Sequence, residues 1–218
     1  MQAPTPTTGS SAESSAEAGF DLDAVEIRVL GVLIEKAFVT PDAYPMSINA
    51  ILTGSNQLTA REPVMSLSEA EVQAAIDSLI GRRLVSKRDQ PSARVAKYEH
   101  LVRLRHSLPP PEQAVLATLM LRGAQTAGEL RQRCERLHRF DDIAAVDAVL
   151  EHLAEKYPAL TRPLARAPGT KETRHVHLLG GEAAVEEMAE SQHAGGASAG
   201  RGRIAELDKQ RADEKAAA

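Results

Sequence analysis

The sequence has little of several features that stabilise or target other classes of protein. It contains one cysteine, Cys134, no tryptophan, and only 3% aromatic residues. A single cysteine rules out an intrachain disulfide, so we expect a reducing, cytoplasmic location. With so few aromatics, the core must be built from Leu, Val, Ile and Ala, which suits packed helices better than a large sheet. We expect no membrane segment, because no apolar run reaches the length of about 18 residues that a span needs.

The first twenty residues are rich in Ser, Thr, Ala and Pro and lack both basic residues and an apolar stretch. This composition predicts a disordered leader over residues 1–20 and not a signal peptide. A strong excess of positive charge is also missing. Residues 21–104 carry ten Lys/Arg and eleven Asp/Glu, and residues 105–181 carry eleven and nine. Neither half therefore has the basic excess typical of a dedicated nucleic-acid-binding domain.

Helix signals and a hairpin signal follow the leader in a definite order. Asp21 or Asp23 can cap a first helix that runs to about residue 37. Ser47 caps a second helix over residues 48–55, and Ser68 with Glu71 forms a capping box that opens a third. Two strands are predicted over residues 84–88 and 94–100. Three helices followed by a hairpin is the order of a winged-helix domain.

The same order repeats after three consecutive prolines at 109–111. In the first helix of each copy, an offset of 86 relates two sets of residues: Glu26, Val29, Leu30 and Leu33, and Glu112, Val115, Leu116 and Leu119. In the third helix, an offset of 74 relates Val72, Ile76 and Leu79 to Val146, Leu150 and Leu153. Thr126 caps the second helix of the second copy, predicted to run through Leu137, and a hairpin follows over residues 160–166 and 173–179.

The two offsets differ by twelve, which places an insertion of about twelve residues in the first copy. It falls around residues 40–45 and 56–67 and is too polar to be expected in the core. The sequence therefore predicts a mainly α chain with small β-hairpins, of class α+β. Two tandem winged-helix domains occupy residues 21–104 and 105–181. A charged tail, residues 182–218, begins with a short helix, has a flexible middle, and ends in a second short helix at 204–217.

Several stretches also resemble a known family. They are Tyr44-Pro45-Met46-Ser47-Ile48-Asn49, the run from Asn56 to Val64, the run from Leu121 to Thr126 with Gly128-Glu129-Leu130-Arg131, and Arg166-Ala167-Pro168-Gly169. Over residues 21–181 the chain resembles the YceH family of uncharacterised bacterial proteins. The resemblance implies a double winged-helix fold and brings no established activity with it.

In a winged helix the third helix reads the major groove, so DNA contacts are expected first on the third helices. Acidic residues stand at their leading ends, Glu69 and Glu71 in one copy and Asp141 and Asp142 in the other. Carboxylates repel phosphate, so these helices are poorly suited to binding in the major groove of DNA. Positive charge gathers elsewhere. The first patch is on the end of the third helix and the hairpin of the first copy: Arg82, Arg83, Lys87, Arg88, Arg94 and Lys97. The second patch lies on or just after the second helix of the second copy: Arg131, Arg133, Arg136 and Arg139.

Asn56, Gln57 and Arg61 form a separate candidate group in the insertion. Amides and a guanidinium make paired hydrogen bonds to base edges, which favours direct contact with DNA. The same groups also tie down a loop by bonding its backbone, and Arg61 stands beside Glu62 as a local ion pair would. Both interpretations are open from the sequence.

Chemistry-bearing motifs are missing from the sequence. It has no nucleophile elbow, phosphate loop or HExxH motif, so we expect no enzymatic activity and no cofactor. Cys134 and His138 have helical metal-ligand spacing and His175 and His177 share a strand face, but no further ligands complete a site, so no metal is predicted. The leading hypothesis is DNA-linked transcriptional regulation through double-stranded DNA. The alternative is a protein–protein adaptor that uses the acidic third helices or the groove between the domains.

Overall fold

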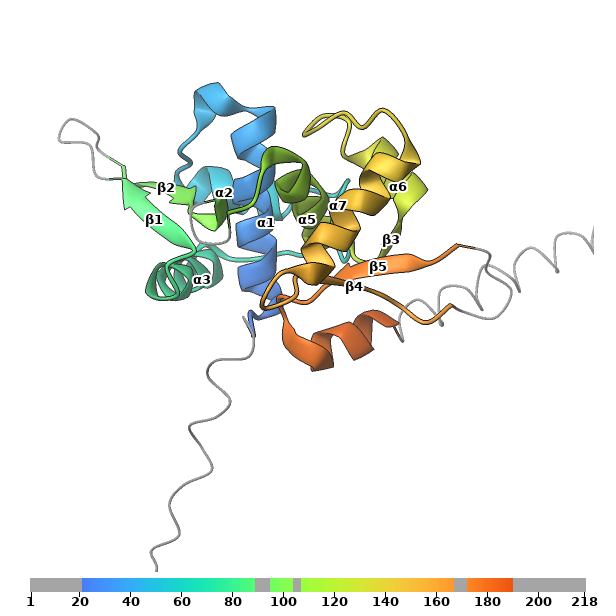
Figure 1. Ribbon diagram of the computed structural model, residues 1–218. Coiled ribbons are helices and arrows are strands. Elements are labelled where there is room, and N and C mark those ends of the chain that lie inside the picture. The colour runs from blue at the N-terminus through green and yellow to red at the C-terminus, as the bar shows by residue number, and fades with distance from the viewer. Residues whose placement is uncertain (1–20, 89–94, 104–106, 167–171, 190–218) are drawn as a thin grey trace, which may run out of the picture.

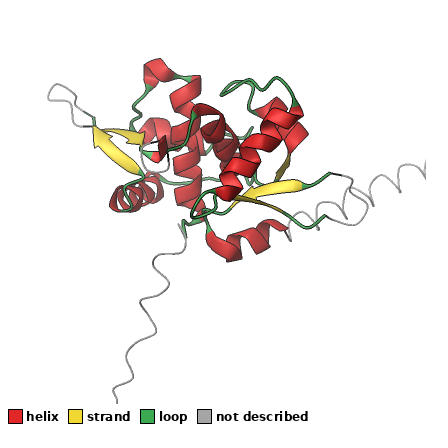
Figure 2. Cartoon of the chain, viewed as in Figure 1, coloured by secondary structure: helices red, strands yellow, loops and turns green. Residues whose placement is uncertain are grey.

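The computed structural model describes residues 21–88, 95–103, 107–166 and 172–189 (Figure 1). The expected leader, Arg94 and the helix expected at 204–217 lie outside the described residues. Within them the chain is mainly helical, with short antiparallel strands in two small sheets (Figure 2). The predicted α+β class is therefore confirmed.

Three helices and a hairpin occur twice in the described chain. The first unit comprises α1 (Ala24–Val39), a short 3-10 helix η1 (Pro41–Ala43), α2 (Ile48–Ser55), α3 (Glu69–Gly81), β1 (Val85–Arg88) and β2 (Lys97–His100). The second comprises α5 (Pro110–Arg122), β3 (Gln125–Thr126), α6 (Ala127–Arg133), α7 (Ile143–Glu155), β4 (Thr161–Pro163) and β5 (Arg174–His177). Residues 181–189 are helical again.

Most helices begin at the caps that the sequence predicts. The Asp23 carboxylate accepts hydrogen bonds from the amides of Val25 and Glu26, each at 2.8 Å. Ser47 caps α2, and capping boxes open α3 at Ser68 and α6 at Thr126. These interactions satisfy backbone amides that have no partner inside the helix, so they fix each start locally.

Each hairpin has an additional short strand partner that the sequence pattern did not predict. In the second unit β3 pairs with β5, and β5 also pairs with β4. In the first unit Met46 forms an isolated bridge with Tyr98 on β2. Both additional pairings immediately precede the cap of the second helix. They anchor that helix to the hairpin of its own unit.

The second helix of the second unit is shorter than predicted. It ends at Arg133, with Cys134 as its C-cap, and does not continue to Leu137. The amides of Leu137 and His138 both donate to the Cys134 carbonyl, at 2.7 and 2.8 Å, and close a turn instead. Cys134 is completely buried, so the turn is held by the core beneath it.

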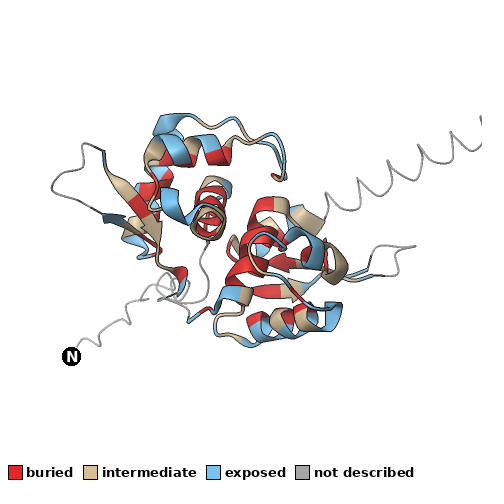
Figure 3. Cartoon of the chain, turned by 90° about the horizontal axis from the view of Figure 1, so that it is seen from above, coloured by how far each residue is buried: buried red, intermediate tan, exposed pale blue. Residues whose placement is uncertain are grey.

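The two units share one hydrophobic core, centred on α1 and α5 (Figures 1 and 3). The repeat-related residues Val29 and Val115, and Leu33 and Leu119, are all buried there. At Gly31, a Cβ would lie 3.1 Å from Leu121 of α5, so the absent side chain allows the close approach. The shared core means that the two units form one packed body.

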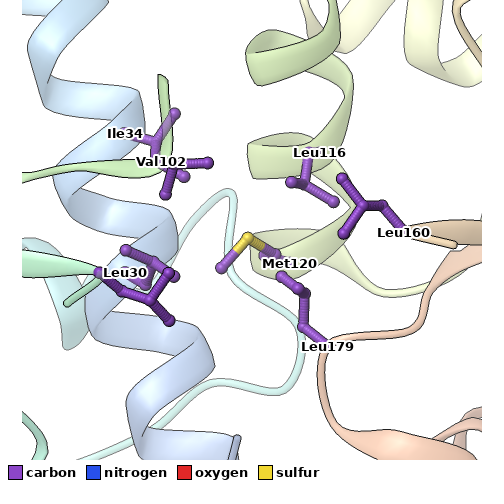
Figure 4. Close-up of a pocket in the computed structure, with 8 residues that line it drawn as sticks. Leu30, Ile34, Val102, Leu116, Met120, Leu160 and Leu179 are labelled. Atoms are coloured by element: carbon purple, nitrogen blue, oxygen red, sulfur yellow. The ribbon is translucent and has the colours of Figure 1, made fainter. Parts of the chain in front are cut away.

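A small apolar cavity of about 10 Å³ remains where the two units meet (Figure 4). Leu30 and Ile34 line it from the first unit, and Leu116, Met120 and Leu160 line it from the second. It offers no polar partner and is about the minimum size for one water, so we expect it to be dry. The junction is otherwise filled by side chains.

The insertion of the first unit was expected to lie outside the core, and this expectation was wrong for part of it. The Glu62 amide donates to the carbonyl of Leu121 on α5 at 2.8 Å, so the insertion reaches the second unit. Arg61 is only 4% exposed. The physical reason is that hydrogen bonds inside the protein satisfy this polar side chain, so its burial is not penalised.

Candidate functional site

Arg61 holds the insertion in place through all three of its guanidinium nitrogens. Nε donates to the carbonyl of Gly54 at 3.0 Å, near the end of α2, and Nη1 donates to the Ala60 carbonyl at 2.9 Å. Nη1 and Nη2 also donate hydrogen bonds to the two carboxylate oxygens of Glu35, at 3.2 and 2.7 Å. The ion pair considered with Glu62 is thus formed with Glu35. With its side chain buried and engaged, Arg61 is not free to contact a base edge, which corrects that expectation.

Asn56 and Gln57 are also engaged within the loop. Asn56 exchanges two hydrogen bonds of 2.8 Å with the backbone of Leu67, and the Gln57 side-chain oxygen accepts from Arg61 at 2.7 Å. Of the two interpretations left open by the sequence, the loop-tying one describes these contacts. Gln57 is half-buried and still lines a surface groove described below.

The first basic patch is partly neutralised by acids of its own unit. Arg82 pairs with the buried Glu26, with 3.5 Å between Nε and Oε1, and Arg88 pairs with Glu99 at 2.7 Å. Arg83 and Lys87 are exposed, and Lys97 is half-buried. Arg83 has a φ of 59°, a left-handed backbone that turns the chain from α3 into β1.

The two basic patches lie on separate parts of the fold. The hairpin β1–β2 lies at one end of the molecule and α6 lies at the other (Figures 1 and 2). The second patch begins with Arg131, which is exposed and donates to the Asp141 carbonyl at 2.8 Å. Arg133 contacts Gln125 and lies 3.6 Å from Glu129. The two patches are therefore not neighbours in the fold.

Instead, the second patch meets the insertion loop across a groove between the two units, which we call the basic groove. Its volume is about 280 Å³. Its charged and amide lining residues are Glu35 and Lys36 of α1, Gln57 of the loop, Arg122 at the end of α5, Arg133 of α6, and Arg136 just after α6. Sequence reasoning missed Lys36 and Arg122, because neither has another cation near it in sequence and only the tertiary fold adds them to the cluster.

Positive charge dominates this groove. Its only carboxylate, Glu35, is already bound by Arg61 at 2.7 Å and by Lys36 at 3.4 Å. Burial, followed by repulsion from neighbouring Arg133, lowers the pKa of Arg122. Glu129 also lies 3.6 Å from Arg133, but the cations of the groove still outnumber the acids that pair with them, and this excess favours the binding of an anion.

The other candidate groups do not line this groove. The Cys134 thiol is buried 3.2 Å from the Thr118 hydroxyl, and burial raises its pKa to about 11. His138 packs edge-on against Phe140. Among the residues that the structure describes, no group of three or more His, Cys, Asp or Glu side chains is placed to hold a metal. No helix in this part of the chain is both long and apolar enough to cross a membrane.

The exposed faces of the third helices carry acidic and small side chains. On α3 the exposed residues include Glu71, Ala74 and Asp77, and on α7 they include Asp147 and Glu151. The acids that the sequence places on these helices are therefore exposed to solvent.

Comparison with known proteins now identifies the family. The model of a protein family of unknown function, DUF480, matches residues 22–170. The chain belongs to the DUF480 family. A UPF0502 protein of Aromatoleum aromaticum is 71% identical over 199 residues, which cover 90% of this chain and 87% of the relative. One from Azoarcus sp. is 70% identical over 200 residues, covering 90% and 88%, and one from Citrifermentans bemidjiense is 44% identical over 191 residues, covering 87% of each.

The resemblance to the YceH family is confirmed at this level, since YceH is itself a UPF0502 protein. The DUF480 match covers the first unit, the connection between the units and the second unit as far as residue 170, and so includes the insertion and the basic groove but not β5. The names of these relatives state no activity. Function must therefore be argued from the geometry of the site.

Proposed function

We propose that this DUF480 protein is a non-enzymatic, cytoplasmic regulator that binds double-stranded DNA through two winged-helix units. The observation that carries the proposal is the basic groove. Lys36, Arg122, Arg133 and Arg136 surround a single carboxylate that other side chains already neutralise. Phosphate is the anion that DNA presents in quantity, and neutralising it supplies most of the affinity of non-specific binding.

The groove is better suited to the phosphate backbone than to reading bases. Its cations come from α1, α5 and the region of α6, so they hold an anion between the two units. The acidic third helices stay away from phosphate under this arrangement. The exposed Arg83, in the turn before the first hairpin, and Lys87, on its strand β1, supply a second phosphate contact at the far end, as the hairpin of a winged helix does.

The test is fluorescence anisotropy of a labelled duplex pool, titrated at several salt concentrations. Two double variants are compared, Lys36→Ala with Arg136→Ala in the groove and Arg83→Ala with Lys87→Ala on the hairpin. Each removes two positive charges, so the variants have the same net charge and differ only in where the charge is lost. We expect the groove variant to bind DNA more weakly than the wild-type protein. The slope of log K against log salt concentration should become shallower by about 2, because two phosphate contacts are lost. No binding of the wild-type protein at low salt, or wild-type affinity in the groove variant, would contradict this role for the groove.

The second candidate function is a protein–protein adaptor. It is favoured by α7, whose exposed acids Asp147 and Glu151 lie between Ile143, 49% exposed, and Tyr157, 98% exposed. Aromatic and aliphatic anchors beside acids suit a partner with a basic and apolar surface. A pull-down that retains a purified partner with wild-type protein and loses it with Glu151→Lys and Tyr157→Ala supports this function. Retention by both variants argues against it.

A further inference from the structure

A second and larger pocket lies on a different face of the junction. Its volume is about 360 Å³, in the range of pockets that hold small molecules. Five segments meet there: the start of α1, the insertion at residues 62–65, the end of α5 with the turn after it, the end of β5, and the helical residues 181–189. The pocket shares only Arg122 with the basic groove.

The apolar part of the lining is adaptable. Met65, Met120 and Met188 come from three separate segments, and Ile27 adds a branched side chain from α1. Unbranched, polarizable methionine side chains fill irregular space and repack around ligands of different shape. These walls therefore favour the apolar body of a small molecule.

The same pocket contains a buried cation that lacks a counter-ion. Arg28 is 1% exposed, and its Nη1 and Nη2 donate to the carbonyls of Ser55 and Pro63 at 3.0 and 2.6 Å. Its Nε has no partner, and among the described residues no carboxylate lies within ion-pair distance of the guanidinium. Burial, and then repulsion from Arg61, outweigh the attraction of Glu62 and lower the pKa of Arg28 to about 10. An anion in the pocket would stabilise this buried charge.

Arg28 is also a departure from the internal repeat. The equivalent position in the second unit, at the offset of 86, is Ala114. The second unit lacks the insertion whose carbonyl at Pro63 Arg28 binds. The cation is thus specific to the first unit, where the pocket lies.

Two further polar groups restrict the kind of anion. Arg122 adds a second guanidinium to the lining, and His177 is 4% exposed with an unpartnered Nδ1. The acids Glu62 and Glu187 also line the pocket, and both are exposed. They oppose a ligand with several negative charges, so a single carboxylate on an apolar body is the best match.

We propose that this pocket binds a small apolar monocarboxylate, whose charge is balanced by Arg28 and Arg122 and whose body rests on the three methionines. This ligand site goes beyond the proposed binding of DNA and does not depend on it. A small molecule bound at the junction of the two units would occupy a site other than the basic groove, with Arg122 as the residue that lines both.

The test uses the full chain with its methionine methyl groups labelled with ¹³C and titrated with octanoate in NMR spectra. We expect the signals of Met65, Met120 and Met188 to shift in a saturable way. Met46, buried in the first unit and absent from this pocket, is the internal control. Octan-1-ol and octylammonium provide the same body without the negative charge, and we expect each to bind at least tenfold more weakly.

Octanoate binding by pocket variants locates the site without any measurement of DNA binding. Arg28→Met can fail to fold, so Arg122→Gln is used to weaken octanoate at least tenfold and Ala184→Phe is used to fill the pocket and abolish binding. Arg136→Gln, which alters the basic groove only, should leave octanoate binding unchanged. The proposal is overturned by saturation with octan-1-ol at the same concentration as octanoate, by the absence of shifts at millimolar octanoate, or by undiminished binding to folded Ala184→Phe.

Discussion

Glu112 and Lys156 form an ion pair, with 3.0 Å between Oε2 and Nζ, that repeats the pairing of Glu26 with Arg82 in the first unit. Both acids occupy the third position of the first helix of their unit, and both cations are the C-cap of the third helix. The offset of 86 relates the acids and the offset of 74 relates the cations. The pair therefore links the first and third helices in each unit, and it gives Arg82 a structural role.

Removing the buried acid tests this link. The Glu112 side chain is only 7% exposed, so Glu112→Gln leaves Lys156 half-buried without its counter-charge. We expect the free energy of unfolding to fall by about 1–3 kcal/mol. Urea denaturation measures the change, with the exposed Glu155→Gln as the matched control. A double-mutant cycle with Lys156→Met should show a coupling energy, and its absence would mean that the two side chains act independently.

A second prediction concerns Arg61. Lysine at this position keeps the charge, but its single ammonium cannot reach Glu35, Gly54 and Gln57 together as the guanidinium does. We expect Arg61→Lys to destabilise the protein by about 2 kcal/mol or more. The exposed Arg136→Lys should change stability by less than about 0.5 kcal/mol. Equal stability of the two variants in urea would show that the Arg61 contacts contribute little.

Features set by local hydrogen bonds could be predicted from the sequence. Asp23, Ser47, Ser68 and Thr126 each cap the helix that was expected to start there, because a cap requires only residues two or three positions away. The two-residue strand β3 could not be found, since a strand this short shows no alternation of apolar residues.

The site depended on contacts between distant residues, so little of it could be predicted. Arg61 was correctly noticed, but its partner Glu35 lies 26 positions away and outside the insertion. Arg133 belongs to the second basic patch, yet the cations that join it in the groove, Lys36 and Arg122, come from other helices. Composition and spacing identify charged residues, whereas the fold decides which of them share a surface.

The histidines give the protein a pH-dependent stability. His177 and His100 end the strands that pair with β4 and β1, and burial is the main cause that lowers the pKa of each to about 4. Their folded pKa lies below the unfolded value of about 6.5, so the folded state resists protonation. The contribution of the neutral histidines to the stability of the fold is complete above about pH 6.5 and is lost as the pH falls toward 4.

We expect each histidine to reduce the free energy of unfolding by up to about 1.4 kcal/mol per pH unit in this range. Urea midpoints at pH 7.5, 6.0 and 5.0 measure the loss. His177→Gln should remove about half of the pH dependence while folding at pH 7.5. If the variant follows the same pH dependence as the wild type, His177 is not responsible.

The contact between α1 and α5 predicts that the two units unfold together. Because a Cβ on Gly31 would lie 3.1 Å from Leu121, Gly31→Leu must push the helices apart, and we expect a loss of about 3 kcal/mol. Gly81, at the end of α3, has nothing within 4 Å of its Cβ position, so Gly81→Ala should be neutral or stabilising by up to about 1 kcal/mol. Hydrogen exchange on the wild type should show both units opening with one free energy, since they share one core. In Gly31→Leu that common value should fall for amides of both units, whereas a fall confined to the first unit would show that the junction does not couple them.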